Sequence, residues 1–490
     1  MSTALRAFAL AAMASLTACQ TLGPDYQLPN EAALKRADLQ GELATGGAPV
    51  VSAPVPGNWW QLYEDPRLDQ LVREALASNT DLRVAAANIA RASFQTQQAE
   101  AEGGFNASVS AEAQRLQESG EAFLLAEKVP VGNIGAAQIK TSYQFDLWGT
   151  LKRGVEAANA NADAAQAAAD TARITVVADV VRAYTQVCAA NEERDIALHS
   201  LDLQQQGVNL AQRLRDAGRG DETQVTRTQT QFKSLRAELP RYQAARAAGL
   251  YRLSMLLARP LDQLPAGVGD CAELPHIAQA LPVGDGASLL KRRPDVRRAE
   301  RQLAAATARI GVATGQLYPD ISIGATVGTV GLLENLGTPE TNRWGFGPMV
   351  SWTLPTNGAR ARIREAQAAT QGALASFDGT VLNAVREVQT TLASYAAALE
   401  RRDALADAER SARDAADQSH RFYLAGRQSF LEDLQATRTY TNARAQLAEA
   451  NTQVAMQQVD LFLALGGGWE RPPAGVAKPV NKPSVPSATN

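Results

Sequence analysis

The sequence of 490 residues lacks long apolar runs, has few aromatic side chains and carries no excess of basic charge. Because no run of about 18 or more apolar residues occurs, no segment is suited to cross a membrane as a helix. Any membrane-spanning segment would therefore have to be a β-strand. Aromatic residues make up only 6% of the chain, which is low for a domain with one thick core. With a net charge of −3, the chain has no basic excess that would argue for binding to nucleic acid.

Residues that carry enzyme chemistry are sparse and scattered. The three histidines, His199, His276 and His420, lie far apart and lack the spacing of metal ligands. No Gly-x-Ser-x-Gly nucleophile motif occurs. The glycines at 466–468 follow a helical pattern, so they suit a helix end and not a phosphate loop. The sequence therefore predicts no enzyme activity, no metal site and no cofactor.

The three cysteines stand in different contexts. Cys19 ends a Leu-Thr-Ala-Cys sequence after Arg6 and a short apolar run, which predicts a lipoprotein signal peptide, cleavage before Cys19 and acylation of its sulfur. An ordinary signal peptide with a chance cysteine is the alternative. Gln20 stands where an Asp would favour the inner membrane, which points to the outer membrane. Export would permit a disulfide, but Cys188 lies in a heptad-like apolar row, which favours a buried thiol over a bond to Cys271.

Alternating apolar and polar residues predict four strands of membrane length. In segment 137–148, Ala, Ile, Thr, Tyr, Phe and Leu alternate with Gln, Lys, Ser, Gln and Asp. A strand here would have one apolar and one polar face, and roughly 9–11 residues suffice for a tilted transmembrane strand. Segments 105–113, 321–330 and 344–354 show the same alternation, and 105–113 can pair with 137–148 as a hairpin.

Long helical patterns precede and follow the strand pairs. Segments 68–102 and 297–314 are expected helices before the strands, and 154–216 and 357–424 are much longer helices after them. A tight turn follows each long helix, and a second helix then runs back along it, to about residue 258 in the first half and about residue 465 in the second. The helices keep polar faces rich in Gln and Thr, whereas a packed bundle would bury a broader apolar stripe. This pattern favours helices arranged around water.

The second half of the chain repeats the plan of the first. When the halves are aligned on their turns, Arg213, Ala217, Gly218, Arg219, Arg236, Ala237 and Leu239 match Arg421, Ala425, Gly426, Arg427, Arg444, Ala445 and Leu447. This match favours an internal duplication. We therefore expect a signal peptide (1–18), a lipidated tether (19–58), a first repeat (59–260), an irregular connector (261–285), a second repeat (286–470) and a disordered tail (471–490).

Four strands in one chain cannot close a transmembrane barrel. Such barrels begin at about eight strands, and an open sheet edge cannot be left in lipid. With four strands in each chain, a dimer would supply eight strands and a trimer twelve.

Several short motifs occur in a set order: the sequence around Cys19, Gly23-Pro24-Asp25-Tyr26, Trp59-Trp60 with Asp65-Pro66-Arg67-Leu68, Phe145-Asp146-Leu147-Trp148-Gly149, Arg292-Arg293-Pro294-Asp295-Val296, and the segment 421–432. Each motif is weak alone, but the order is specific. Over nearly all of residues 19–469 the chain resembles the TolC/OprM-type outer-membrane efflux family, in its lipoprotein (NodT-like) branch.

The resemblance implies an α+β membrane protein. A homotrimer would form a twelve-stranded transmembrane β-barrel, continued by a long periplasmic α-helical barrel with a mixed equatorial region. The chain would be the outer-membrane channel of a tripartite efflux system. It would passively conduct substrates delivered by a periplasmic adaptor and an inner-membrane pump, of which the resemblance favours the RND type. It would be lipid-anchored in the outer membrane and extend into the periplasm.

Two other classes of protein remain as alternatives. A periplasmic coiled-coil structural lipoprotein would account for the helices but not for the four alternating strands. An exported enzyme would need a catalytic site, and the sequence offers none.

The two helical turns are expected at the periplasmic tip, farthest from the membrane. Gly218 and Arg219 lie in the first turn, and Gly426 and Arg427 lie in the second. Good helix caps alone would explain both glycines. The resemblance adds a contact between these turns and the adaptor.

The start of the last helix is expected to narrow the channel. By resemblance, Leu431 falls at a constricting apolar position of the closed gate. Many relatives carry Asp four residues later, but this chain has Gln435 there. Asp433 is the candidate that could replace the missing carboxylate.

Overall fold

The computed structural model describes residues 21–41, 46–117, 119–124, 126–271 and 273–467. The signal peptide, Cys19 and the tail 471–490 lie outside the described residues. The chain forms two compact units. Among the described residues, the sheet unit draws on 21–32, 87–166 and 298–379, and the helical unit on 33–86, 167–297 and 380–467. Both units take stretches from both halves of the sequence.

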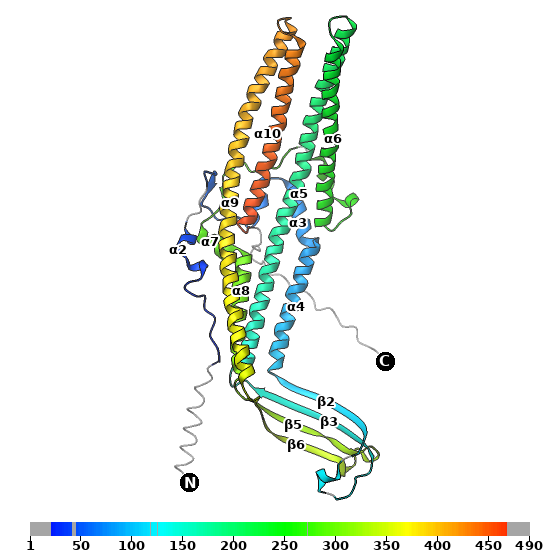
Figure 1. Cartoon of the computed structure of the whole chain (residues 1–490), viewed down its shortest axis with the longest axis vertical. Helices are drawn as coiled ribbons and strands as arrows, with labels where there is room; N and C mark the ends of the chain where they lie inside the picture. The colour runs from blue at the N-terminus through cyan, green and yellow to red at the C-terminus, as the bar shows by residue number, and fades with distance from the viewer. Residues whose placement is uncertain (1–20, 42–45, 118, 125, 272, 468–490) are drawn as a thin grey trace. The chain divides into compact units, whose positions relative to one another are not determined.

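The sheet unit contains one antiparallel sheet of four strands in the order β2-β3-β5-β6 (Figure 1). The strands are β2 (Phe105–Leu116), β3 (Gly132–Phe145), β5 (Asp320–Leu332) and β6 (Asn342–Ser351). All four predicted strands are therefore confirmed. The largest shift in bounds is that of β3, which begins at Gly132 and not at residue 137, and ends at Phe145 and not at residue 148. It ends there because the Asp146 carboxylate accepts hydrogen bonds from the backbone N–H groups of Leu151 and Lys152 at the start of the next helix.

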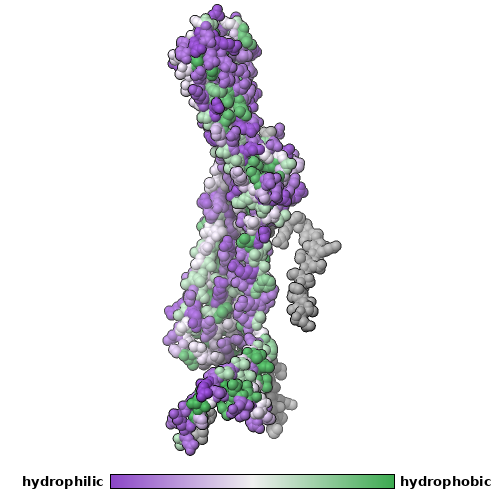
Figure 2. Space-filling model, turned by 90° about the vertical axis from the view of Figure 1, so that its right-hand side faces the viewer, coloured by the Kyte–Doolittle hydropathy of each residue, from purple (hydrophilic) through white to green (hydrophobic). Residues whose placement is uncertain are grey.

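The register places the apolar residues of all four strands in the same rows. Val109 pairs with Ile139, which pairs with Val327, which pairs with Trp344. These four residues are 79%, 46%, 58% and 81% exposed, respectively. The next row, on the opposite face, holds Ser108, Lys140, Thr326 and Gly345. Successive residues of a strand point to opposite faces, so the sheet has the predicted apolar and polar faces (in Figure 2, hydrophobic residues gather at the strands).

Pro348, which the sequence placed within a strand, lies on β6 at the edge of the sheet and pairs with Ile323 of β5. Proline cannot donate a backbone hydrogen bond, so edge strands are where a sheet tolerates it.

The long helices cross the boundary between the units, which falls within α4 (Thr80–Glu102), α5 (Thr150–Asp216), α8 (Pro294–Gly315) and α9 (Asn357–Leu424). The helical unit adds α2 (Ala37–Gln40), α3 (Pro66–Ser78), α6 (Glu222–Leu256), α7 (Gly286–Arg292) and α10 (Phe430–Ala464). It also holds the short parallel pair β1 (Val50–Val51) and β4 (Leu281–Pro282). Within the described residues, no helix is long and apolar enough to span a bilayer.

Short 3-10 helices occupy the connections: η1 (Ala33–Lys35), η2 (Trp59–Tyr63), η3 (Gly120–Phe123), η4 (Leu261–Gln263), η5 (Val268–Asp270), η6 (Leu333–Asn335) and η7 (Pro339–Thr341).

The predicted single helix 68–102 is wrong, because the chain breaks at Asn79 into α3 and α4. The Asn79 side chain is buried and accepts hydrogen bonds from the backbone N–H groups of Asp81 and Leu82. Its amide group donates to the carbonyl of Leu256, 2.9 Å away, at the end of α6. Asn79 therefore caps one helix and ties it to the end of another.

The hydrophobic core of the helical unit contains the predicted coiled-coil seam of α5 together with buried side chains of η2, α3 and α10. The α5 side chains at Ile174, Val177, Val181 and Tyr184 are all buried. Trp59 is fully buried and stacks on Phe462 of α10, with ring centroids 4.6 Å apart. α10 ends at Ala464, and Gly466 follows it with φ +65, so the predicted helix-end role of the first glycine at 466–468 is confirmed.

The prediction of a free thiol at Cys188 is wrong, because Cys188 forms a disulfide with Cys271. The irregular connector lies against α5 and α6, which brings the two cysteines together. Asn191 of α5 donates hydrogen bonds to the carbonyls of Gly269 and Cys271, and Arg246 of α6 also donates to Gly269. The apolar row around Cys188 gave no sign of this partner, which lies 83 residues away in the sequence.

We predict that the double substitution Cys188→Ser with Cys271→Ser lowers the free energy of unfolding of the helical unit by about 4 kcal/mol, because the unfolded chain loses a long covalent loop. The measurement is loss of helical circular dichroism against urea concentration. Dithiothreitol should lower the midpoint for the wild type and leave the double variant unchanged. Equal midpoints for the oxidised wild type and the double variant would contradict the prediction.

Candidate functional site

The candidate site consists of the two helical turns and the first residues of α10, all within the helical unit. Both turns have the same backbone. Gly218 and Gly426 adopt φ +68 and +69. The N–H of Arg219 donates to the carbonyl of Leu214, and the N–H of Arg427 donates to the carbonyl of Phe422, each at 2.8 Å. This is the Schellman arrangement, which satisfies the last carbonyls of a helix.

Side chains close the first turn through ion pairs. Arg215 contacts Asp216 at 2.7 Å and Glu222 at 3.0 Å, which joins the end of α5 to the start of α6. These hydrogen bonds raise the pKa of the Arg215 guanidinium. Asp221 caps α6 by accepting a hydrogen bond from the N–H of Gln224 at 2.7 Å.

A capping box starts α10 after the second turn. The Ser429 hydroxyl accepts from the N–H of Glu432, and the Glu432 carboxylate accepts from the N–H of Ser429, as the sequence predicted. The hydrogen bond from Ser429 lowers the pKa of Glu432. The rings of Tyr423 and Phe430 lie 5.8 Å apart across the turn.

The candidate gate residues lie on two sides of α10. Leu431 is 47% exposed, and Gln435, one helical turn later, is also exposed. Asp433 is buried and points away from them. The structure therefore groups Leu431 with Gln435 and does not bring Asp433 to the same face.

Asp433 instead joins α9 to α10. Its Oδ2 lies 3.1 Å from Nδ1 of His420, which is on the last turns of α9. Its buried Oδ1 has no hydrogen-bond partner among the described residues. Sequence reasoning considered His420 only as a metal ligand and missed this contact. The sequence did hint at this contact. His420 and Asp433 are separated from Gly426 by nearly the same number of residues, so a helical hairpin that turns at Gly426 brings them side by side.

The two helical hairpins contact each other near the turns. Gly207 of α5 faces Leu434 of α10, and a Cβ added at Gly207 would lie 3.2 Å from the Leu434 side chain. Gln204, also on α5, is buried and donates to the carbonyl of Thr228 on α6. The buried side of this region is thus closely packed, while Gly218, Arg219, Gly426 and Arg427 are all exposed.

Within the sheet unit, the N-terminal strap 21–26 packs at the junction of strand and helix. The N–H of Leu22 donates to the carbonyl of Trp148, and a Cβ on Gly149 would lie 2.5 Å from Thr21. Arg153 of α5 pairs with Asp25 at 2.6 Å. Two of the sequence motifs therefore meet here, directly after the predicted lipid-attachment residue Cys19, which lies outside the described residues.

Tyr26 extends this contact to α8. Its hydroxyl donates to Glu300, 3.3 Å away, and the Arg301 guanidinium lies over its ring. Burial and the neighbouring Glu300 carboxylate raise the pKa of Tyr26 to about 12. In the described part of the chain, no group of three or more His, Cys, Asp or Glu residues is placed to hold a metal ion.

Comparison with known proteins gives consistent matches along the chain. The model of the family "Outer membrane efflux protein" matches residues 71–259 and 287–467. Nodulation protein T of Rhizobium leguminosarum bv. viciae is 29% identical over 479 residues, which cover 96% of this chain and 95% of that protein. The probable outer membrane lipoprotein SilC of Salmonella typhimurium is 26% identical over 95% of this chain and 99% of its own length.

Solved structures agree with these matches. The outer-membrane channel OprN has a TM-score of 0.82 and 31% identity, and covers 92% of this chain and 100% of its own. The open state of the Neisseria gonorrhoeae MtrE outer membrane channel has a TM-score of 0.79 and 26% identity over 92% of this chain and 99% of its own. Proteins of this family form channels and work with a periplasmic adaptor and an inner-membrane pump. The chain belongs to the outer membrane efflux protein family, as the outer-membrane channel component of a tripartite efflux system.

Proposed function

We propose that three copies of the chain form one conducting tube. A twelve-stranded β-barrel would lie in the outer membrane and continue as a periplasmic α-helical barrel with a mixed equatorial region. The observation that carries this proposal is the four-stranded sheet with an exposed apolar face, whose edge strands β2 and β6 each have one partner in the described chain. In lipid, each unpaired backbone group would cost several kcal/mol, so the edges would pair with neighbouring copies.

The same arrangement supports the proposed division of the chain. The first repeat (59–260) supplies the hairpin β2–β3, and the second repeat (286–470) supplies β5–β6. Each repeat then adds one pair of long helices, and the connector 261–285 belongs to the equatorial region. The N-terminal tether (19–58) would lead from the lipid anchor.

The apolar row of the sheet would face the lipid, and the row containing Lys140 would face the lumen. We predict that Ile139→Arg weakens assembly by roughly 2–4 kcal/mol, because it places a charge near the middle of the bilayer. The neighbouring substitution Lys140→Arg serves as the control and should be tolerated. The measurement is the fraction of trimer on unheated detergent gels, and equal losses in both variants would contradict this orientation.

Cys19 would carry the lipid anchor. The strap that begins at Thr21 is pinned to Trp148 and Gly149, where the strands meet the helices, so an acyl chain on Cys19 would start close to the membrane surface. We predict an acylated N-terminal Cys19 in the intact mass of the mature protein. A mature protein that starts at another residue with a free amine would contradict it.

The two exposed turns would meet the adaptor, through Gly218, Arg219, Gly426 and Arg427. No heavy atom lies within 4 Å of a Cβ added at Gly218 or Gly426, so both turns are open to a partner. The pump that delivers substrate would be of the RND type.

Leu431 would close the channel at this end. In the trimer, three copies would crowd the axis, with Gln435 one turn further along and Asp433 as a support for the hairpin through His420. A small polar side chain at 431 would loosen this contact.

We predict that Leu431→Ser raises single-channel conductance in planar bilayers and increases uptake of a bulky antibiotic, without loss of trimer. Leu382→Ser is the matched control, because Leu382 is 44% exposed but lies on α9, far from the turn. Unaltered conductance in an assembled Leu431→Ser trimer would place the gate elsewhere, and absence of ion conductance in both the wild-type and the Leu431→Ser trimer would contradict the channel function itself.

A further inference from the structure

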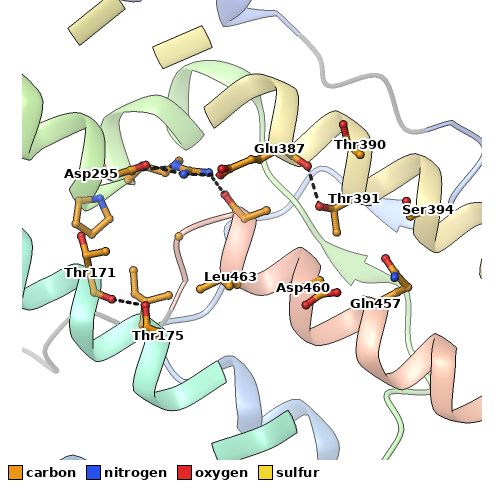
Figure 3. Close-up of a pocket in the computed structure, with 15 residues that line it drawn as sticks. Thr171, Thr175, Asp295, Glu387, Thr390, Thr391, Ser394, Gln457, Asp460 and Leu463 are labelled. Carbon is orange, nitrogen blue, oxygen red and sulfur yellow. Dashed lines mark hydrogen bonds and ion pairs between the residues drawn. The ribbon is translucent and has the colours of Figure 1, made fainter. Parts of the chain in front are cut away.

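A cavity of about 450 Å³ lies inside the helical unit, where α5, α9 and α10 meet the start of α8 (Figure 3). Its size is in the range of small-molecule sites, about 300–1,000 Å³. Its polar lining includes Thr171 and Thr175 of α5, Thr391 of α9, and Asp460 of α10. The cavity plays no part in the turns, the strap or the sheet described above.

Three threonine hydroxyls of this lining already donate their protons to the protein, and Thr390, Ser394 and Gln457 complete its uncharged polar part. Thr171 donates to the carbonyl of Ala167 and Thr175 to that of Thr171, both at 3.1 Å. Thr391 donates to the carbonyl of Glu387 at 2.7 Å. A hydroxyl has one proton and two lone pairs, so these oxygens can only accept a hydrogen bond from a ligand.

The charged residues of the lining also offer acceptors. Asp295, Glu387 and Asp460 contribute three carboxylates against the single guanidinium of Arg293. Arg293 directs its three nitrogens at Asp295, Glu387 and the carbonyl of Ala464. Burial lowers the pKa of Arg293, but the hydrogen bonds to Asp295 and Glu387 outweigh this and raise it. Arg293 therefore remains a cation that is already occupied by protein acceptors.

Asp460 has room for a further donor. Within the described chain, Arg182 of α5 contacts its Oδ1, which leaves Oδ2 available. Figure 3 shows Asp460 beside Gln457 on α10, with Leu463 nearby on the same helix. Ile174, Pro294 and Leu463 supply the apolar part of the lining.

We propose that this cavity binds an organic cation, with an ammonium, guanidinium or aromatic amine as donor and a compact apolar body. An acceptor-rich wall favours ligands with N–H donors, and carboxylates strengthen such bonds when the ligand is charged. The apolar residues would contact the hydrocarbon or aromatic part. The proposal rests on the proposed channel function, and it places a binding site for an organic cation within the helical unit.

The test uses ethidium, an aromatic cation with two amino groups, and follows its fluorescence on binding to the purified full-length protein. Thr391→Val and Asp460→Asn should each weaken binding by about tenfold or more, because each removes an acceptor or its charge. Thr391→Ser keeps the hydroxyl and should retain the wild-type affinity. The anionic dye anilinonaphthalene sulfonate should not compete with ethidium.

Thr370→Val provides the matched control. Thr370 lies on the same helix α9 and donates to the carbonyl of Ala366 at 3.0 Å, but it is not part of the cavity. The proposal is overturned if ethidium binds the wild type, Thr391→Val and Asp460→Asn equally, or if Thr370→Val weakens binding as much as they do.

Potassium conductance of the wild-type and Leu431→Ser proteins, measured in parallel, separates the two proposals. A protein that conducts but does not bind ethidium overturns the cation site alone. A protein that binds ethidium with the expected dependence on Thr391 and Asp460, but does not conduct, overturns the channel function alone.

Discussion

The pairing of backbone groups along β2 and β6 is the constraint on which the rest of this molecule depends. A sheet with an exposed apolar face suits lipid, where side chains such as Val109 and Trp344 are favourable and unpaired N–H and C=O groups are not. Within a single chain, the inner strands β3 and β5 each have a hydrogen-bonded neighbour on both sides. Its outer strands β2 and β6 need further partners, so one chain supplies only a part of the closed β-barrel that we propose.

The same requirement shapes the ends of the helices. At Asn79 a side chain replaces the missing backbone partners, and at Gly218 and Gly426 a left-handed residue lets the chain satisfy its own carbonyls. Where α10 ends, Arg292 and Arg293 donate to the carbonyls of Leu465 and Ala464. These side chains explain why the motif around Arg293 is rich in arginine.

The sequence was sufficient to predict the elements that depend on local periodicity. The strand alternation, the α5 seam, the capping box at Ser429 and the glycine turns all follow from residues within a few positions of one another. The features that were missed depend on distant residues. Asn79 caps α4 while it contacts Leu256, Cys188 bonds to Cys271, and the cavity needs side chains from helices far apart in the sequence.

The local backbone of the candidate turns could be predicted from the sequence, whereas the contacts of their side chains could not. The positions of Gly218, Gly426 and Leu431 follow from the helix boundaries alone. Whether Asp433 faces the channel with Leu431 or faces the hairpin depends on helical phase and on what packs against α10. His420 supplies that partner, and no local pattern identifies a lone histidine as the partner of a buried carboxylate.

The two helical hairpins have the same backbone conformation at their turns, but a disulfide closes a covalent loop around only the first turn. The Cys188–Cys271 bond closes the chain around the first turn, so a protease that cuts at Gly218 would leave both pieces joined. The second hairpin contains no cysteine, and a cut at Gly426 would separate the chain into two polypeptides. A single cut in the backbone therefore affects the duplicated halves differently. The disulfide holds the two pieces together in the first half, whereas only non-covalent packing does so in the second.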